Sequence, residues 1–241
     1  MPERSTRKSP VIPLVIAAVA AVALLATLIG QLTGGDGDAG DEAAGPAAAS
    51  SAEQGGGDDP LAGLARRQQD DPMAMGDVDA PVVLIAYSEF QCPFCGKFAR
   101  DTAPVLEEKY VADGTLRIEW RDFPYLGPES TTAALAGRAA AAQDSFWEFH
   151  DAMYAEQLPP NSGNLDRDYV IGIAEQLGLD VEQFEADLDS AKIEQQVRDD
   201  FAEGQSIGVT GTPSFLVNGT PIVGAQPTEV FEQVIEDAAA S

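Results

Sequence analysis

The chain has few cysteines, one histidine and a shortage of basic residues. Its 241 residues include two cysteines and 14 lysines or arginines against 40 acidic residues, which gives a formal net charge of −26. Two cysteines are too few for a disulfide-rich scaffold, an all-cysteine zinc site or a four-cysteine iron–sulfur centre. The acidic balance argues against nucleic acid as a partner, because phosphate binding requires a basic surface. The cysteines can still form one disulfide, one redox pair or two unrelated thiols.

Charge is also absent from residues 11–30, an apolar run of 20 residues. As a helix this run would be about 30 Å long, which is enough to cross a bilayer. It follows a basic tail, residues 1–10, with net charge +2, and no small-x-small cleavage pattern comes directly after it. We therefore expect a single-pass anchor in the cell membrane, with the tail in the cytoplasm and the acidic remainder outside. A cleaved signal peptide is the alternative.

Large apolar side chains are scarce in residues 31–60, which hold seven acids and no base. Their glycine, alanine, serine and aspartate content predicts a flexible acidic linker. This linker would join the anchor to an extracytoplasmic folded domain, residues 61–241. Because it carries no separate dimerisation domain, we expect a monomer.

The folded domain opens with the pattern of an α/β protein. Residues 82–87 are a continuous β-branched run that predicts a buried strand, and residues 116–120 predict a second one. The helix predicted between them starts at Cys92, and Pro104 predicts a kink or break within it. Strand, helix and strand in this order favour a βαβ unit and a mainly parallel sheet. The apolar side of the helix is expected from four residues: Phe94, Phe98, Val105 and Leu106.

Strand patterns are missing from residues 129–205, where the composition and apolar spacing predict four or five helices. Strands return at residues 214–217 and 222–223, and the Asn-Gly pair between them predicts a hairpin. A terminal helix is expected after Pro227, with Val230, Phe231 and Ile235 on its apolar face. The sequence therefore predicts an α/β fold with a helical insertion between a βαβ half and a ββα half.

Cys92 and Cys95 form a C-x-x-C motif at the start of the predicted helix. The free N–H groups and the positive dipole end of a helix N-terminus stabilise a thiolate and lower its pKa. Cys95 lies one turn later on the same face, so the two sulfurs are within disulfide reach. Pro93 suits the first helical position, where its missing N–H has no partner to lose. We expect an exposed Cys92 to attack and a less exposed Cys95 to resolve a mixed disulfide.

Other interpretations of the two cysteines are open but less favoured. A structural disulfide across two residues would close a very short loop and stabilise little through chain entropy. A zinc site would need two more ligands, and His150 is the one nitrogen ligand that the sequence offers. Two inert thiols outside the cytoplasm would oxidise. We therefore expect a redox dithiol that needs neither a metal nor a dissociable cofactor.

A proline enters the first strand of the predicted hairpin at Pro213. Proline cannot donate a hydrogen bond to a strand ladder, so its presence favours a loop that faces something other than a strand. We expect the Thr212–Pro213 bond to be cis, since cis prolines belong to specific turns. A trans proline at the start of an edge strand is the alternative.

The segments YSEFQCPFCGKF (Tyr87–Phe98) and GVTGTPSFLVNG (Gly208–Gly219) resemble the two signature segments of the DsbA-like family, which has the thioredoxin fold. The order of predicted elements is also similar over roughly residues 72–239. The resemblance implies that Cys92 is the nucleophile, that Cys95 resolves, and that Pro213 is a cis-proline facing the disulfide. It further implies that the backbone of Thr212 pairs with a bound substrate strand.

By the same resemblance the chain is expected to be an extracytoplasmic thiol-disulfide oxidoreductase that introduces disulfides into folding exported proteins. A quinone-linked membrane partner would reoxidise it. A reductase or isomerase, a non-enzymatic peptide-binding module with a structural disulfide, and a metal-delivery protein are the alternatives.

Two positions depart from the family pattern. The buried acid that many thioredoxin-like enzymes carry six residues before the first cysteine is Ala86 here, so Glu89 is either its substitute or a solvated loop acid. The Pro93-Phe94 pair stands where strongly oxidising relatives often have a histidine between the cysteines. We therefore expect a less depressed pKa for Cys92 and a less extreme oxidant. His150 is expected to be structural or exposed rather than catalytic.

Overall fold

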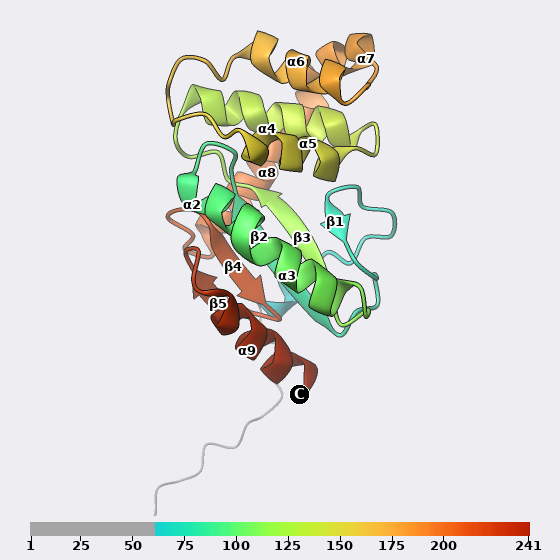
Figure 1. Ribbon diagram of the computed structural model, residues 1–241, viewed down its shortest axis with the longest axis vertical. Helices are drawn as coiled ribbons and strands as arrows, with labels where there is room; N and C mark the ends of the chain where they lie inside the picture. The colour runs from blue at the N-terminus through green and yellow to red at the C-terminus, as the bar shows by residue number, and fades with distance from the viewer. Residues whose placement is uncertain (1–60) are drawn as a thin grey trace, which may run out of the picture. The chain divides into compact units, whose positions relative to one another are not determined.

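A computed structural model describes residues 61–241 (Figure 1). The predicted cytoplasmic tail, anchor and linker lie outside the described residues. Within the described part, no helix combines the length and apolar character needed to span a membrane. The described chain opens with a short 3-10 helix, η1 (Ala62–Leu64).

The core of the fold is a five-stranded mixed sheet in the order β1-β3-β2-β4-β5. The two predicted strands, β2 (Val82–Ser88) and β3 (Leu116–Asp122), pair in parallel at its centre. The predicted hairpin is β4 (Ser214–Val217) and β5 (Thr220–Val223), with β4 antiparallel to β2. A two-residue strand, β1 (Ala74–Met75), pairs with β3 at the other edge and was not predicted. The predicted α/β fold class is confirmed.

The helix after β2 is continuous but irregular. It comprises two α segments and two π segments: α2 (Pro93–Lys97), η2 (Phe98–Thr102), α3 (Ala103–Leu106) and η3 (Glu107–Val111). The predicted break at Pro104 is therefore a change of helix type, because proline has no N–H to donate to the α-helical ladder.

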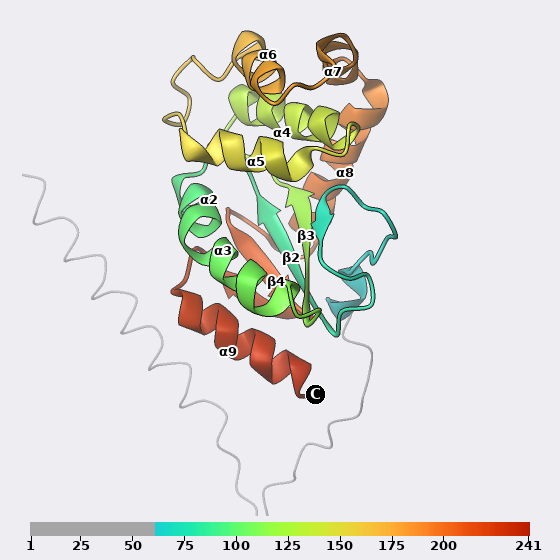
Figure 2. The same ribbon diagram turned by 45° about the vertical axis from the view of Figure 1, so that its right-hand side comes forward.

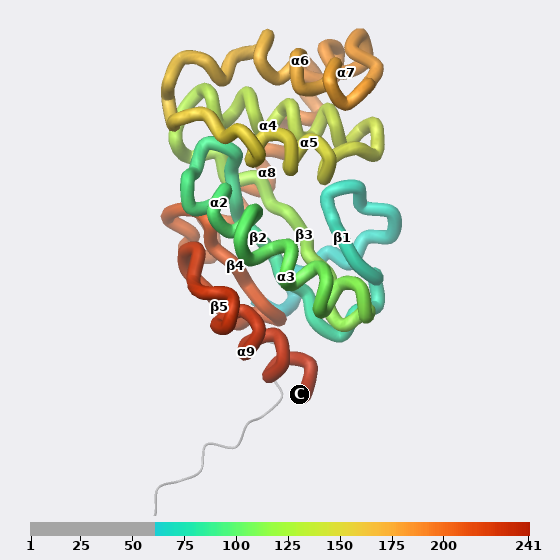
Figure 3. The backbone as a smooth tube through the Cα atoms, in the orientation of Figure 1, coloured from blue at the N-terminus to red at the C-terminus, as the bar shows by residue number. Residues whose placement is uncertain are grey.

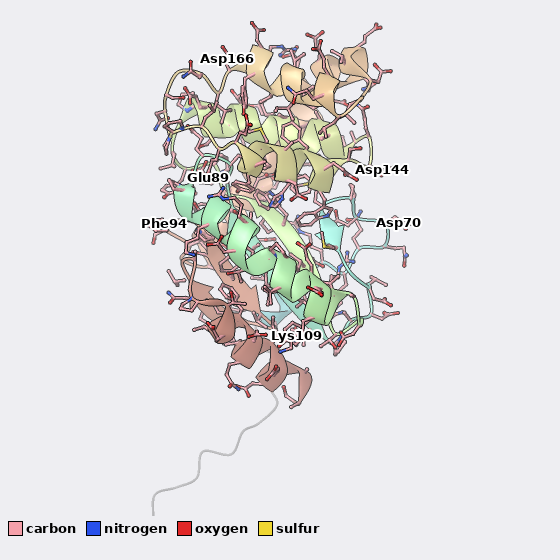
Figure 4. The ribbon with its side chains drawn as sticks, viewed as in Figure 1. Asp70, Glu89, Phe94, Lys109, Asp144 and Asp166 are labelled. Atoms are coloured by element: carbon pink, nitrogen blue, oxygen red, sulfur yellow. The ribbon has the colours of Figure 1, made fainter. Side chains whose placement is uncertain are left out.

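The predicted apolar side of this helix is partly wrong. Phe98 and Leu106 are buried, but Phe94 and Val105 are 63% and 40% exposed. The wider π turns change the angular position of later residues, so Leu106 faces the sheet and Val105 turns outward. Phe94 lies in the first turn and projects from the start of α2 into solvent (Figure 4).

The terminal helix α9 (Thr228–Ala239) lies beside α3 on the same face of the sheet (Figure 2). Phe231 and Ile235 are fully buried, and the ring of Phe231 lies 5.2 Å from Phe98 and 5.0 Å from Phe215. Val230, predicted to share this apolar face, is 39% exposed. The buried stripe continues at three- and four-residue spacing from Phe231, which rotates Val230 toward solvent.

Between β3 and β4 the chain forms five helices with no strand among them, as expected of the helical insertion. They are α4 (Pro128–Ala141), α5 (Phe146–Ala155), α6 (Arg167–Gln176), α7 (Val181–Leu188) and α8 (Ala191–Ser206). This helical group lies beyond the carboxyl ends of β2 and β3 (Figure 2), and the backbone trace returns from it to the sheet through α8 (Figure 3). The carboxyl end of β2 therefore meets the insertion at the C-x-x-C motif.

A buried network of ion pairs joins the insertion to the sheet. Arg138 of α4 contacts both Asp122 of β3 and Asp200 of α8. Glu119 of β3 accepts hydrogen bonds from Arg117 at 3.1 Å and Arg121 at 2.8 Å. Arg121 also pairs with Glu203 of α8, so the network fixes the insertion against β3.

Candidate active site

The C-x-x-C motif lies where the turn after β2 enters α2. Cys92 caps α2 with an extended backbone (φ −70°, ψ 119°), and Pro93 occupies a first-turn position as predicted. Both cysteines are free thiols, with Cys92 2% and Cys95 1% exposed. The expectation of an exposed Cys92 is therefore wrong.

Cys92 is covered by the loop that precedes β4. The Thr212–Pro213 peptide bond is cis, so the prediction is confirmed and the trans alternative is wrong. The Cys92 thiol donates a hydrogen bond to the Thr212 carbonyl oxygen, with 3.2 Å between Sγ and O. The structure thus brings together the two segments that resemble the signature motifs, although 120 residues separate Cys92 from Thr212.

The two thiols differ in acidity. The pKa of Cys92 falls from 9.0 to about 6, mainly through its hydrogen bond with the Cys95 side chain, which together with Thr212 and the N–H groups of Cys95 and Phe94 outweighs burial. Burial, and next the adjacent Cys92 sulfur, raise the pKa of Cys95 well above 9.0. At neutral pH the pair therefore favours a thiolate on Cys92 and a protonated Cys95.

Glu89 is buried in the turn between β2 and Cys92, with 2% of its surface exposed. Its Oε2 accepts hydrogen bonds from Ser130 Oγ at 2.6 Å and from the Gln91 N–H at 3.1 Å, while its buried Oε1 has no hydrogen-bond partner in the described chain. Burial is the main cause that raises the pKa of Glu89 to about 7, and the neighbouring Cys92 raises it further. The solvated-loop alternative is therefore wrong, because the insertion covers this turn (Figure 4).

Residues of the insertion that the sequence analysis missed hold the active-site turn. The Gln157 side-chain amide donates to the carbonyl oxygens of Phe90 at 2.8 Å and Cys92 at 2.9 Å. The Tyr154 hydroxyl donates to the Glu89 carbonyl oxygen at 2.9 Å, and the Asn161 N–H donates to Gln91 Oε1 at 2.7 Å. No motif marks Gln157 or Asn161. The one available signal was the aromatic-rich segment of residues 146–154, which ends in Tyr154.

Comparison with known proteins decides the family. A family model described as thioredoxin matches residues 68–237, which is more than two thirds of the chain. The chain belongs to this thioredoxin family. It is 35% identical over 150 residues to a probable disulfide bond formation protein D of Bacillus anthracis, covering 61% of this chain and 69% of that protein.

Solved structures of similar proteins have the same fold as this thioredoxin-family chain. Oxidised BdbD from Bacillus subtilis has a TM-score of 0.66 at 23% identity, with 71% of this chain and 94% of that chain covered. A thioredoxin-like oxidoreductase from Silicibacter pomeroyi has a TM-score of 0.61 at 26% identity, with 72% and 99% covered. The predicted DsbA-like resemblance is confirmed, and the chain is a thiol-disulfide oxidoreductase of the DsbA type.

Exposed apolar side chains lie around the cis-proline loop and at the start of α2. Phe94 and Val223 are 63% and 71% exposed, and Tyr125, on the loop after β3, is 41% exposed. A groove of about 360 Å³ runs from the cis-proline loop along β4 and β5. Its lining includes Gly211, Thr212, Pro213, Leu216 and Val223. These surfaces suit an extended, partly apolar polypeptide.

His150 lies away from this surface. It is 7% exposed, and its Nδ1 is 2.8 Å from an Asp151 carboxylate oxygen. Five aromatic rings surround it: Phe90, Trp120, Phe146, Trp147 and Tyr154. The expectation of a structural histidine matches this packing. Across residues 61–241, no three histidine, cysteine or acidic side chains gather in a way that could hold a metal ion.

Proposed function

We propose that this chain introduces disulfides into exported proteins by exchange at Cys92 and Cys95. The observation that carries the proposal is the acidity difference between the two thiols, with the more acidic thiol beside the cis-proline loop. A thiol of low pKa is a good leaving group, and stabilising its thiolate stabilises the reduced pair. Both effects favour donation of the disulfide to a substrate.

The reaction proceeds in two exchanges. A substrate thiolate attacks Cys92 Sγ of the Cys92–Cys95 disulfide; the S–S bond breaks, and Cys95 leaves with the electron pair and takes up a proton. A second substrate thiol then loses its proton and attacks the substrate sulfur of the mixed disulfide. Cys92 leaves as a thiolate. Two electrons have passed from the substrate dithiol to the cysteine pair, and the substrate carries the new disulfide.

Thr212 and Pro213 serve substrate binding in this proposal. The backbone of Thr212 offers hydrogen-bonding groups to an extended strand next to Cys92, as in β-augmentation. Pro93 and Phe94 complete the first turn of α2, and the exposed Phe94 ring provides apolar contact. Unfolded or folding proteins fit this surface because they present extended apolar segments.

The location and redox partner extend the proposal. The apolar run of residues 11–30 would anchor the catalytic domain on the outer side of the cell membrane, where structural disulfides persist. A quinone-linked membrane protein would then reoxidise the cysteine pair after each turnover. The relative named disulfide bond formation protein D supports the oxidative direction.

The test uses the full chain and an unfolded polypeptide with two thiols. The oxidised chain should convert this dithiol to its disulfide, and Cys92→Ser should abolish turnover. Cys95→Ser, loaded as a mixed disulfide, should transfer its adduct without resolving it internally. If the reduced chain reduces the substrate disulfide faster than the oxidised chain forms it, the reductase or isomerase alternative is favoured. Unchanged function in Cys92→Ser would favour the peptide-binding module.

A further inference from the structure

A loop of the insertion crosses the first turn of α2 at Gln157. The loop follows the last residue of α5, Ala155, and the carbonyl oxygen of the preceding residue, Tyr154, accepts a hydrogen bond from Arg100 at 2.7 Å. Three residues later the Gln157 amide reaches the active-site turn. The loop is therefore fastened to the helix that follows Cys92 immediately before it meets the residues around Cys92.

Both donors of the Gln157 side chain serve this turn. A glutamine amide has two N–H donors, and here one nitrogen lies within hydrogen-bond distance of the carbonyl oxygens of Phe90 and Cys92. The Cys92 carbonyl oxygen also accepts the Gly96 N–H at 3.1 Å. Gln157 thus binds the turn at the residues on both sides of Gln91. It gives the Cys92 carbonyl oxygen a second hydrogen-bond donor besides the Gly96 N–H.

Gly96 allows this close crossing. A Cβ atom on Gly96 would lie 2.9 Å from Gln157 Cδ, closer still to Gln157 Oε1, and 2.7 Å from an Arg100 guanidinium nitrogen. These distances are shorter than real Cβ contacts, so a side chain at this position would displace the Gln157 amide. The sequence therefore has a glycine at the position where the Gln157 amide crosses α2.

The geometry of this turn decides how well the Cys92 sulfur is stabilised as a thiolate. The N–H groups of Phe94 and Cys95 act on the sulfur only while the first turn holds its orientation. Although α2 continues into η2, its first turn is the free end of the helix and is exposed at Pro93 and Phe94, so few ladder bonds hold it. Contacts from outside the helix add to these bonds.

We propose that Gln157 is a positioning residue through which the helical insertion holds the first turn of α2 in the geometry that stabilises the Cys92 thiolate. Gln157 touches neither sulfur nor substrate in this role. It acts through the carbonyls of Phe90 and Cys92. The inference rests on the proposed function only in taking the Cys92 thiolate as the reactive species.

The first variant is Gln157→Met in the full chain, because methionine keeps the length and removes the amide. The thiolate absorbance of the reduced protein, followed between about pH 4 and pH 8, should show the Cys92 pKa raised by about a half to one unit. The equilibrium constant for reduction of the disulfide by glutathione at pH 7 should fall by about three- to fivefold, since a less stable thiolate makes the reduced pair less favourable.

Gln143→Met is the matched control. Gln143 also makes two side-chain bonds to backbone within the insertion, donating to the Asp180 carbonyl oxygen at 3.1 Å and accepting from the Asp180 N–H at 2.8 Å. Gln143 follows the C-terminal end of α4, whereas the N-terminal end of α4 carries Ser130, which contacts Glu89 next to the active-site turn. Its loss should lower thermal stability without moving the Cys92 titration or the glutathione equilibrium.

Gly96→Ala should displace the Gln157 amide from the turn without changing residue 157 itself. It should raise the Cys92 pKa in the same direction, and the double variant with Gln157→Met should not add the two shifts, because both remove one interaction. An unchanged Cys92 titration and glutathione equilibrium in Gln157→Met, with a stability loss like that of Gln143→Met, would overturn the proposal. Since the titration does not depend on turnover, this result is distinct from failure of the oxidase assay.

Discussion

Glu89, in the turn after β2, and Glu119, in the middle of the neighbouring strand β3, are both buried glutamates, and they differ in the groups that surround their charge. Both carboxylate oxygens of Glu119 accept hydrogen bonds. The donors are the backbone N–H groups of Arg66 and Arg67 and the guanidinium groups of Arg117 and Arg121. Burial alone would raise the pKa of Glu119, but these donors outweigh it and lower the pKa. Glu119 is therefore held as a carboxylate.

Glu89 shows the opposite outcome. Within the described chain, the groups that lower its pKa are neutral: the Ser130 hydroxyl and the backbone N–H groups of Gln91 and Leu126. Burial raises its pKa to about 7, and the adjacent Cys92 adds to the shift. The comparison shows that the fold compensates the buried charge of Glu119 from β3 and the N-terminal segment, and leaves the buried charge of Glu89 without a cationic partner beside the reactive cysteine.

The largest change in the free energy of unfolding is expected at Glu119, whose buried charge is compensated. Glu119→Gln should lower the free energy of unfolding at pH 7 by about 3–5 kcal/mol, because two buried arginines lose their carboxylate partner. Since the folded pKa of Glu119 is lowered, its contribution is present above the unfolded value near 4.5 and is lost as the pH falls. Urea unfolding followed by tryptophan fluorescence measures this loss.

In Glu119→Gln the Cys92 titration should stay where it is in the parent chain. A loss below about 1 kcal/mol at pH 7, or a variant whose Cys92 pKa also moves, would contradict the separation of the two regions.

A smaller effect of opposite sign is expected at Glu89. Its folded pKa, about 7, exceeds the unfolded value near 4.5, so its favourable contribution is complete below that value and is lost as the pH rises through 7. Glu89→Gln should therefore match the parent near pH 4.5 and exceed its free energy of unfolding by about 1–3 kcal/mol at pH 8. The gain should be larger in the reduced protein, where the Cys92 thiolate adds to the repulsion.

Glu148→Gln, at an exposed acid of α5, is the control for Glu89→Gln and should change stability by less than about 0.5 kcal/mol at either pH. If Glu89→Gln destabilises the protein at pH 8, the Glu89 carboxylate must have compensating partners, and the contrast with Glu119 fails.

The smallest change is expected at Phe94, the exposed side chain in the first turn of α2. Phe94→Ala should leave the free energy of unfolding within about 0.5 kcal/mol, because the ring is 63% exposed. It should raise KM for an unfolded dithiol substrate by about fivefold, which corresponds to about 1 kcal/mol of lost apolar contact. Val105→Ala, which removes an apolar side chain 40% exposed on α3, is the control and should leave KM unchanged. Equal KM values for both variants would remove Phe94 from substrate binding.

Local sequence signals predicted the parts of the fold that depend on neighbouring residues. The apolar run of β2, the Asn-Gly turn between β4 and β5, and the proline at Pro213 each act within a few residues, and each prediction matches the structure. The C-x-x-C motif was likewise found at its helix start because helix initiation is local.

Features that depend on distant contacts could not be predicted in this way. Glu89 is buried because Ser130 and the insertion lie over its turn, and the sequence left open whether it was solvated. The exposure of Val105 follows from π turns that no spacing rule anticipates. Cys92 is covered by a carbonyl 120 residues away, so its burial depends on the assembled sheet.

The reduction potential of the Cys92–Cys95 pair tests the central claim most directly. Equilibration of the full chain with glutathione measures it, and the lowered pKa of Cys92 predicts an oxidising value, near or above about −180 mV. A value near or below about −270 mV would contradict the oxidase and indicate a reductase that must be supplied with electrons. A disulfide that glutathione does not reduce at all would leave a structural bond in place of a redox centre.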